Sequence, residues 1–226
     1  LKISENLYLN DDKKLGIFVQ QDGFFDKDLK EVEELDSSER PLNQNWSWDR
    51  ILRSPYIKQA DVLQGIYFFE DKFGIESIKN NYEFYQKFTV HESSLSPCIH
   101  SIIACKLEKT KSAYELFKRA SRLDLDDYNK EVEEGLHITS MAGSWLTVVE
   151  GFAGMRVKNN SLHFTPCLPK NWEALEFKIN FRQNIYKIEF NKSLFQCSLS
   201  LNQNCFIYVN NQKFTFDING QVRVSI

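Results

Sequence analysis

The chain has 226 residues, of which 42% are hydrophobic and 14% aromatic, and its formal net charge is -3. This length suits one large or two small domains, and the apolar content is enough for a real core. The slight acidity argues against a nucleic-acid or anionic-membrane partner. No apolar run approaches the roughly 18 residues that would predict a membrane span.

The beginning of the chain and its cysteines bear on its origin. The chain starts at Leu1 rather than Met, without an apolar signal core, which indicates part of a longer protein. No two of the five cysteines form a Cys-x-x-Cys pair, so we expect reduced thiols in a cytoplasmic protein. We expect neither a metal site nor a cofactor.

Residues 1–50 show no sustained periodicity. Gly16, Gly23 and Pro41 interrupt them, and residues 26–39 are strongly charged. We predict a long loop with short helices, and a loop of that length in a compact domain is usually functional or incomplete.

From about residue 56 the apolar spacing is that of helices. Apolar residues recurring every three or four positions predict five helices. The first carries two apolar stripes, which indicates burial on more than one side. The predicted helices are 56–73, 75–85, 97–105, 113–123 and 138–152.

After residue 157 the apolar period becomes two, which predicts a meander of short antiparallel strands in a small sandwich or barrel. The charge also divides here, since residues 158–226 hold eight Lys or Arg and only four Asp or Glu. We therefore predict two domains, 1–157 and 158–226. The predicted strands are 175–181, 186–190, 195–201, 214–218 and 222–226, and turns are predicted at 202–204, 210–211 and 219–220.

Two polar segments have the chemistry of a sugar site. In residues 43–50, Trp46 lies among amides and a carboxylate, a combination that suits a pyranose ring and its hydroxyls, although a Trp-capped surface loop is an alternative. Lys58, Gln59 and Asp61 belong to the first turns of an apolar helix and must be paired there. They either bind a ligand or pair with each other, as Lys58 and Asp61 would at i,i+3.

Two further segments place histidine and hydroxyls at helix starts. Residues 91–97 bring His91, Glu92 and three serines to the helix that Pro97 opens, and residues 135–143 repeat the pattern with His137 and Ser140. Free N–H groups at a helix start favour an anion such as phosphate. Serine capping or a structural histidine remains the alternative. No nucleophile elbow, P-loop or dinucleotide motif is present.

Several long motifs, in order, resemble glycoside hydrolase family 65. The likeness runs from about residue 15 to 190 and is closest to the members that act on maltose, followed by those that act on trehalose and kojibiose. The segments are ERPLNQNWSWDR (39–50), IKQADVLQG (57–65), VHESSLSP (90–97), RLDLDDYN (122–129) and GLHITSM (135–141).

The resemblance implies an α+β multidomain protein in which residues 1–157 are the C-terminal part of an (α/α)6 barrel. Residues 158–226 would be a small antiparallel β-sandwich domain. The implied activity is inverting phosphorolysis by a hexosyl glycosyltransferase of carbohydrate metabolism. The substrate would be an α-linked glucose disaccharide, with maltose as the leading candidate, and phosphate would be the co-substrate. The products would be β-glucose 1-phosphate and glucose. Family members are often homodimers.

The resemblance also implies roles for single residues. Lys58 and Gln59 would contact the transferred glucose, and Trp46 would be a further substrate-binding residue. Glu92 would either bind a sugar hydroxyl or support the substrate-binding residues from behind. The phosphate pocket would consist of His137, Ser140, Ser93 and Ser94.

The general acid of the family is a Glu in an Asn-Glu-Tyr-type motif, and residues 1–46 contain no such motif. We expect that Glu upstream of Leu1, so that this fragment alone would be inactive. The alternatives are a family hydrolase of α-glucosides such as trehalose, with a carboxylate base, or a non-catalytic carbohydrate-binding fragment. The histidine and hydroxyls at 137–140 argue against the hydrolase.

Overall fold

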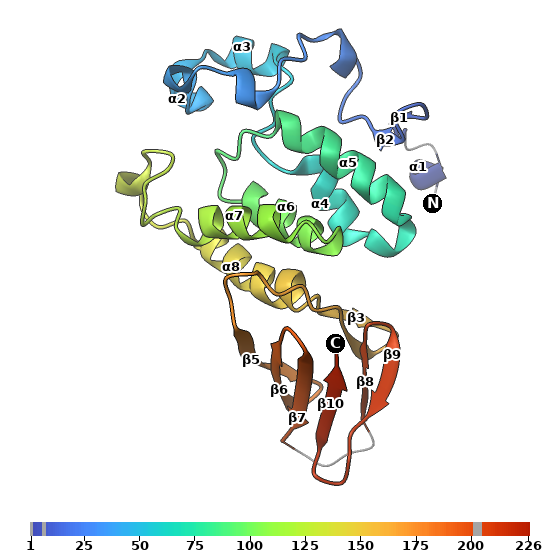
Figure 1. The fold of residues 1–226 in the computed structure, drawn as a ribbon. Helices are drawn as coiled ribbons and strands as arrows, with labels where there is room; N and C mark the ends of the chain where they lie inside the picture. Colours follow the sequence, from blue (N-terminus) through green and yellow to red (C-terminus); the bar gives the residue numbers. More distant parts are fainter. Residues whose placement is uncertain (1, 6–7, 201–204) are drawn as a thin grey trace.

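Helices and strands occupy separate stretches of the chain, as the change in apolar period predicts. The computed structural model describes residues 2–5, 8–200 and 205–226. A helical part is followed by a β domain, and α8 lies between them (Figure 1). In the part of the chain that the structure describes, no helix has both the length and the apolar character needed to cross a bilayer.

The described residues up to Arg53 form the predicted loop with short helices. A two-residue hairpin and several single helical turns follow one another over the top of the helical part in Figure 1. The elements are α1 (Lys2–Glu5), β1 (Asp11–Asp12), β2 (Ile17–Phe18), η1 (Phe24–Asp26), η2 (Val32–Glu34), η3 (Ser37–Glu39), α2 (Leu42–Asn45) and α3 (Trp48–Arg53).

The five predicted helices are present. Pro97 lies in the first turn of α6, which is buried along almost its whole length because α4, α5, α7 and α8 pack around it. This packing unites the apolar faces into one core. The helices are α4 (Asp61–Phe68), η4 (Glu70–Lys72), α5 (Ile75–Phe88), α6 (Ser96–Lys106), α7 (Thr110–Ser121), η5 (Val132–Glu134) and α8 (Ile138–Leu146), which continues as the π-helical η6 (Thr147–Phe152).

The start of the first predicted helix is wrong. Residues 56–60 lie outside α4, because Ile57 forms a parallel bridge with Thr89. Lys58 and Gln59 therefore lie in the segment that precedes the helix, and they are not on its first turns.

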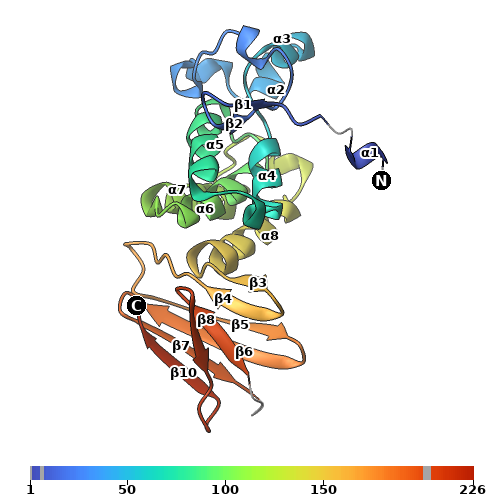
Figure 2. The same ribbon diagram turned by 90° about the vertical axis from the view of Figure 1, so that its right-hand side faces the viewer.

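The β domain is a sandwich of two four-stranded sheets, ordered β10-β7-β6-β5 and β3-β4-β8-β9, which face each other in Figure 2. Both contribute to one core, where the rings of Phe164 and Phe195 lie 5.1 Å apart. The strands are β3 (Arg156–Lys158), β4 (Ser161–Phe164), β5 (Ala174–Phe181), β6 (Asn184–Asn191), β7 (Leu194–Leu199), β8 (Phe206–Val209), β9 (Gln212–Thr215) and β10 (Gln221–Ser225).

Three of the two-residue hairpin turns share the same backbone conformation. Residues 159–160, 182–183 and 210–211 all have positive φ at both positions, which matches the right-handed twist of the strands that they join. One strand pair departs from the predicted antiparallel meander. β4 and β8 are parallel, because the chain returns to the sheet of β3 and β4 after it has formed β5, β6 and β7 in the other sheet.

Some sequence expectations concern the edges of this domain. The short strands β3, β4 and β8 are not among the predicted ones, and the predicted boundary after residue 157 falls within β3. The predicted turn at 202–204 and the end of the strand at 201 lie outside the described residues.

The segment from 165 to 173, which we call the strap, holds the β domain against the helices. Its Trp172 ring packs against Phe117 and Phe152 at centroid distances of 5.5 and 5.0 Å. Nearby, Arg156 of β3 donates to the carboxylate of Glu70 at 2.9 and 3.1 Å. The two parts are thus joined by an apolar contact and by an ion pair.

Candidate functional site

The helices α4, α6 and α8 begin at the same end of the helical part. The Ile57 N–H donates to the Phe88 carbonyl at 2.8 Å, and the Val90 N–H donates to the Ile57 carbonyl at 3.0 Å. The segments that precede α4 and α6 therefore run side by side. The Ser94 and Thr139 hydroxyl oxygens lie 2.7 Å apart and join the starts of α6 and α8. Three of the four polar segments therefore meet where helix dipoles favour an anion.

The fourth polar segment joins them through Glu92. One oxygen of this buried carboxylate accepts from Arg40 Nε at 3.1 Å, and the other accepts from the Leu42 N–H at 2.7 Å. Both oxygens are thus used by the protein. Glu92 thus connects the start of α2 to the segment that precedes α6.

His137 is oriented by carboxylates. Its Nδ1 lies 2.5 Å from Asp124 Oδ1, its backbone N–H donates to Asp124 Oδ2 at 3.0 Å, and its Nε2 lies 3.8 Å from Glu131. The hydrogen bond from His137 holds the pKa of the Asp124 carboxyl below its usual range. Nδ1 is thus used by Asp124, whereas the 3.8 Å between Nε2 and Glu131 is longer than a hydrogen bond, so Nε2 still has room for one hydrogen bond to a ligand.

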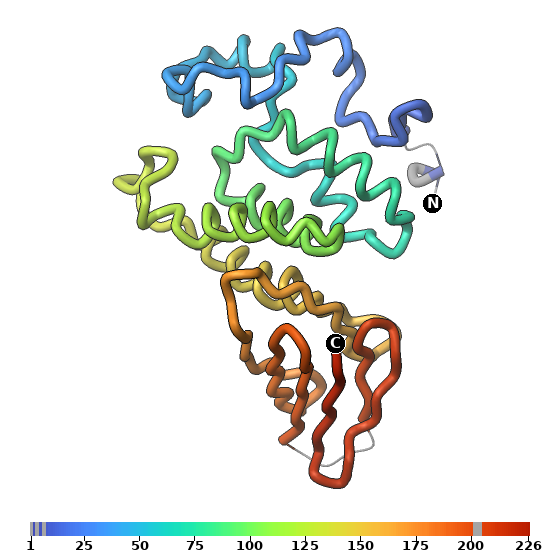
Figure 3. Tube along the Cα trace, in the orientation of Figure 1, coloured from blue at the N-terminus to red at the C-terminus, as the bar shows by residue number. Residues whose placement is uncertain are grey.

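These carboxylates lie on an extended loop, residues 122–137, which leaves the helices on one side in Figure 3. Gln44 Nε2 donates to the Asn129 carbonyl at 2.8 Å, and Asn43 Nδ2 donates to Glu131 at 3.1 Å. The segment around Trp46 is therefore tied to the loop that carries the partners of His137.

The predicted serines differ in what their hydroxyls contact. Ser140 is buried and donates to the Ala120 carbonyl at 2.7 Å, and the Ser93 oxygen accepts from the Leu95 N–H at 3.1 Å. Ser94 is partly exposed and meets Thr139, a residue that sequence reasoning did not single out. Ser94 and Thr139 therefore form the hydroxyl pair that lies open to a ligand.

The predicted sugar-contacting residues border the same end. Lys58 and Gln59 are exposed, and their side chains make no hydrogen bond or ion pair within the described residues. The alternative pair of Lys58 with Asp61 is not formed, because Lys58 precedes the helix, and Asp61 instead accepts from Gln20 at 3.0 Å. Two polar groups of segment 57–61 are thus left for a ligand.

Trp46 lies between other side chains. The Arg50 guanidinium carbon is 3.5 Å from the centre of its ring, and Tyr56 packs edge-on at 5.6 Å. One face of the predicted stacking platform is thus covered within the chain. Its indole Nε1 is buried and has no hydrogen-bond partner among the residues that the structure describes.

Arg119 is a further residue that the sequence did not reveal. Its Nε and Nη2 donate to the His91 carbonyl at 2.9 and 2.7 Å, and this holds His91 at a φ of 54°. The His91 ring packs edge-on against buried His100 at 4.6 Å. Burial and the neighbouring cations lower the pKa of His91 well below its usual range, so this ring stays neutral. No local pattern marks this arginine in the last turn of α7 as part of a site.

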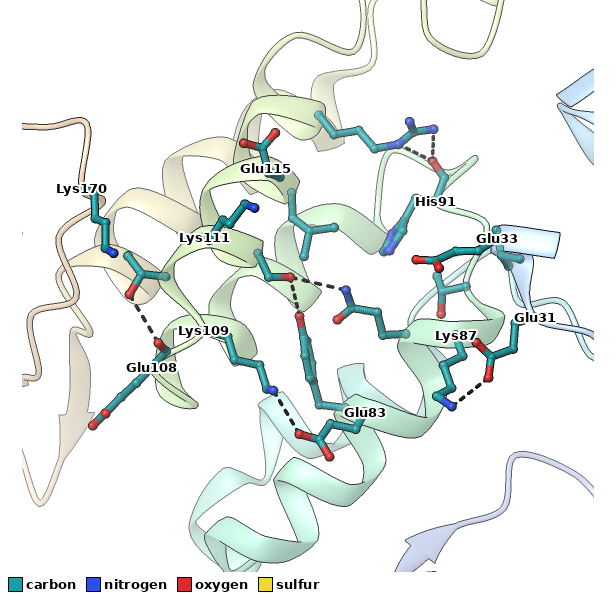
Figure 4. Close-up of a pocket in the computed structure, with 18 residues that line it drawn as sticks. Glu31, Glu33, Glu83, Lys87, His91, Glu108, Lys109, Lys111, Glu115 and Lys170 are labelled. Carbon is teal, nitrogen blue, oxygen red and sulfur yellow. Dashed lines mark hydrogen bonds and ion pairs between the residues drawn. The ribbon is translucent and has the colours of Figure 1, made fainter. Parts of the chain in front are cut away.

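A cavity of about 1110 Å³ lies beside this end, between α5 and α7 (Figure 4). His91 and Thr89 line it, but none of the eight predicted site residues does. Two ion pairs lie at its edges. Lys109 is paired with Glu83 at 3.0 Å, and Lys87 is paired with Glu31 at 2.7 Å. Within the described ranges, no three His, Cys, Asp or Glu residues gather as a metal site would need.

Known proteins share both parts of this chain. The profile of the glycosyl hydrolase family 65 central catalytic domain matches residues 1–146, and that of the family 65 C-terminal domain matches residues 155–216. The two matches meet close to the change from helices to strands.

Curated relatives include the maltose phosphorylase of Bacillus subtilis (strain 168), which is 58% identical over 83% of this chain and 25% of its own length. The alpha,alpha-trehalose phosphorylase of Thermoanaerobacter brockii is 41% identical over 84% of the chain and 25% of its own length. The chain thus spans about a quarter of the curated relatives that it matches.

A solved structure described as a kojibiose phosphorylase from the human microbiome superimposes with a TM-score of 0.91. It is 37% identical, and the match covers 99% of this chain and 29% of that one.

Proposed function

Because this chain belongs to glycosyl hydrolase family 65, we propose that the protein is a disaccharide phosphorylase to which this chain contributes the phosphate side of the active site. The substrate is an α-linked glucose disaccharide. Maltose is the leading candidate, because the maltose phosphorylase has a higher sequence identity to the chain than the trehalose phosphorylase has. The products are β-glucose 1-phosphate and glucose.

The observation that carries the proposal is the meeting of two helix starts around His137. Ser94 and Thr139 present hydroxyls at the N-termini of α6 and α8, and Asp124 directs the imidazole of His137. Hydroxyls, an imidazole and helix N-termini together suit a phosphate dianion.

Phosphorolysis suits this set of groups. An inverting hydrolase needs a carboxylate base to activate water, whereas phosphate arrives already anionic and only has to be held below C1 of the glucose. The phosphate oxygen then attacks C1 while an acid protonates the leaving oxygen. This reaction requires inorganic phosphate as co-substrate and no metal or further cofactor.

The proton donor is proposed to lie in the part of the relatives that this chain does not span. Around the phosphate site, Glu92 is held by Arg40 and Leu42, and Asp124 and Glu131 face His137. None of these carboxylates is available as the acid, so we expect the 226-residue chain alone to be inactive. We also propose that the helical part completes an (α/α)6 barrel in the longer protein, that the protein is a homodimer and that it is cytoplasmic.

The test is an assay of the full-length protein with maltose, with and without inorganic phosphate. Release of β-glucose 1-phosphate that depends on phosphate supports the proposal. Release of two glucose molecules without phosphate would instead identify a hydrolase. Saturable maltose binding without either product would identify a non-catalytic carbohydrate-binding protein.

A further inference from the structure

Two of the five cysteines face each other across the joint between the helical part and the β domain. Cys105 lies in the last turn of α6 and is buried, whereas Cys167 lies in the strap and is partly exposed. Although they are 62 positions apart in the sequence, both belong to the cluster that also contains Phe152.

Contacts with neighbouring residues place the two thiols together. Cys105 lies against Gly151, because a Cβ added to Gly151 would be 3.4 Å from Cys105 Sγ. Cys167 lies against the neighbouring Phe152, because the Cys167 N–H donates to the Phe152 carbonyl at 2.7 Å. Each of the two thiols also shifts the pKa of the other. Thr110 Oγ1, just after the turn that ends α6, lies 3.6 Å from Cys167 Sγ.

The pKa values of the two thiols shift in opposite directions. Because Cys105 and Thr110 stabilise its thiolate, the pKa of Cys167 is lowered to about 7, against the opposing effects of burial and of the Glu108 charge. Donation to Cys167 and burial raise the pKa of Cys105 well above its usual range, although Arg156 acts the other way. Near neutral pH, Cys167 is thus the nucleophile and Cys105 carries the proton.

We propose that Cys105 and Cys167 are an oxidisable dithiol that closes to a disulfide between α6 and the strap. The oxidant is a peroxide. The Cys167 thiolate attacks one peroxide oxygen, the O–O bond breaks, and the departing hydroxide takes a proton to become water. Cys167 is then a sulfenic acid.

In the second step, Cys105 sulfur attacks the sulfenic sulfur, the S–O bond breaks, and the hydroxyl leaves as water with the Cys105 proton. Two thiols are oxidised to one disulfide while one peroxide is reduced to two waters. The bond closes a loop that contains α7, α8 and residues 135–140, and it fixes the β domain to the helices. Such a long closed loop stabilises the folded chain against unfolding.

The test uses the purified 226-residue chain and one equivalent of hydrogen peroxide at pH 7.5. A non-reducing tryptic map should show one new cross-link between peptides 88–106 and 159–170. Fragmentation then has to separate Cys105 from Cys98, because both lie in the first peptide. The oxidised chain should melt several degrees higher than the reduced chain, and dithiothreitol should abolish the difference.

Variants separate the two roles. In Cys105→Ser, dimedone should trap a sulfenic acid at Cys167 and no cross-link should form. In Cys167→Ser, no adduct should appear at Cys105, whereas Cys205→Ser, a matched control in the β domain, should keep the cross-link. If Cys105→Ser does not fold, the wild-type map still decides.

A second measurement follows alkylation of Cys167 by iodoacetamide as a function of pH. The pH at which the alkylation rate is half its maximum should be about 7, and this pH should be higher in Thr110→Val. The proposal would be overturned by a peroxide-treated wild type without the Cys105–Cys167 cross-link, or by equal oxidation of all five thiols.

Discussion

His137 illustrates how much a single contact decides at the residue scale. Asp124 accepts from both the ring and the backbone of His137, so the ring can take only one orientation. A carboxylate on Nδ1 selects the tautomer and leaves Nε2 toward the ligand, as in many histidine sites. The proposed phosphate contact therefore depends on two residues.

We predict that His137→Ala in the full-length protein weakens phosphate use by about 2–3 kcal/mol, because a charge-assisted contact is lost. That corresponds to a roughly 30- to 150-fold loss in kcat/KM for phosphate. Initial rates at varied phosphate measure it, with His163→Ala as control, since His163 stacks on Tyr208 in the β domain. Unchanged phosphate kinetics in His137→Ala would exclude this role.

A second prediction concerns the stability of the Asp124 pair. Since His137 lowers the pKa of Asp124, the unfolded chain takes up its proton first as pH falls. The pair therefore contributes fully above the ordinary Asp pKa of about 4 and is lost as pH falls through the lower folded value. Asp124→Asn should cost about 1 kcal/mol of unfolding free energy at pH 7 and at pH 5, and less at pH 3.5.

Urea unfolding of the 226-residue chain and of the Asp124→Asn variant at these three pH values provides the measurement. Asp217→Asn, in the last turn of the β domain, is a control for general charge effects. A difference that grows as the pH falls would contradict the assigned direction of the pKa shift.

At the scale of elements, the close approach of α6 and α8 determines where the phosphate segments meet. Gly143 of α8 faces Cys98 of α6, and a Cβ at Gly143 would lie 2.7 Å from its Sγ and 2.8 Å from its Cβ. Only a residue without a side chain lets the two helices come so close. The Ser94–Thr139 contact lies at the same end of this helix pair.

We predict that Gly143→Ala destabilises the chain by about 1–3 kcal/mol through overpacking, partly offset by the higher helix propensity of alanine. Guanidinium unfolding of the chain measures the loss. Cys98→Ala should restore part of it in the double variant, because the clashing sulfur is gone. Additive effects of the two substitutions would show that the contact is not tight. Gly65→Ala is the matched control, since a Cβ there meets nothing within 4 Å.

At the scale of the whole molecule, the joint between the two parts combines the packing of Trp172 with a largely buried charge cluster. Burial alone would raise the pKa of Glu70, but Arg156, Lys106 and Lys158 outweigh it and lower the pKa. Arg156 provides the two shortest of these contacts. The cluster therefore favours the assembled arrangement of the two parts at neutral pH.

We predict that Arg156→Ala costs about 2 kcal/mol, because Glu70 then loses its charge-assisted hydrogen bonds while it stays largely buried. Calorimetric unfolding of wild type, of both single variants and of the Arg156→Ala/Glu70→Ala double variant measures this. The double variant should lose less than the sum of the single losses. Arg223→Ala on β10 is the control arginine, and strict additivity would disprove the coupling.

The sequence by itself determined the order of elements and the residue types of the site. The change of apolar period marks the step from helices to strands, because burial selects one face of each element. Hydroxyls and histidines before α6 and α8 were likewise visible as anion-binding chemistry. Short strands such as β8 gave too few alternations to be recognised.

Only the tertiary structure decided which groups face a ligand and which face the protein. Glu92 and Ser140 are polar residues of the predicted site, yet each is satisfied by backbone or arginine partners from elsewhere in the chain. Asp124, Thr139 and the Cys105–Cys167 pair gain their chemistry from partners in space. Local patterns cannot reveal them, because hydrogen bonding and burial depend on segments that are distant in the sequence.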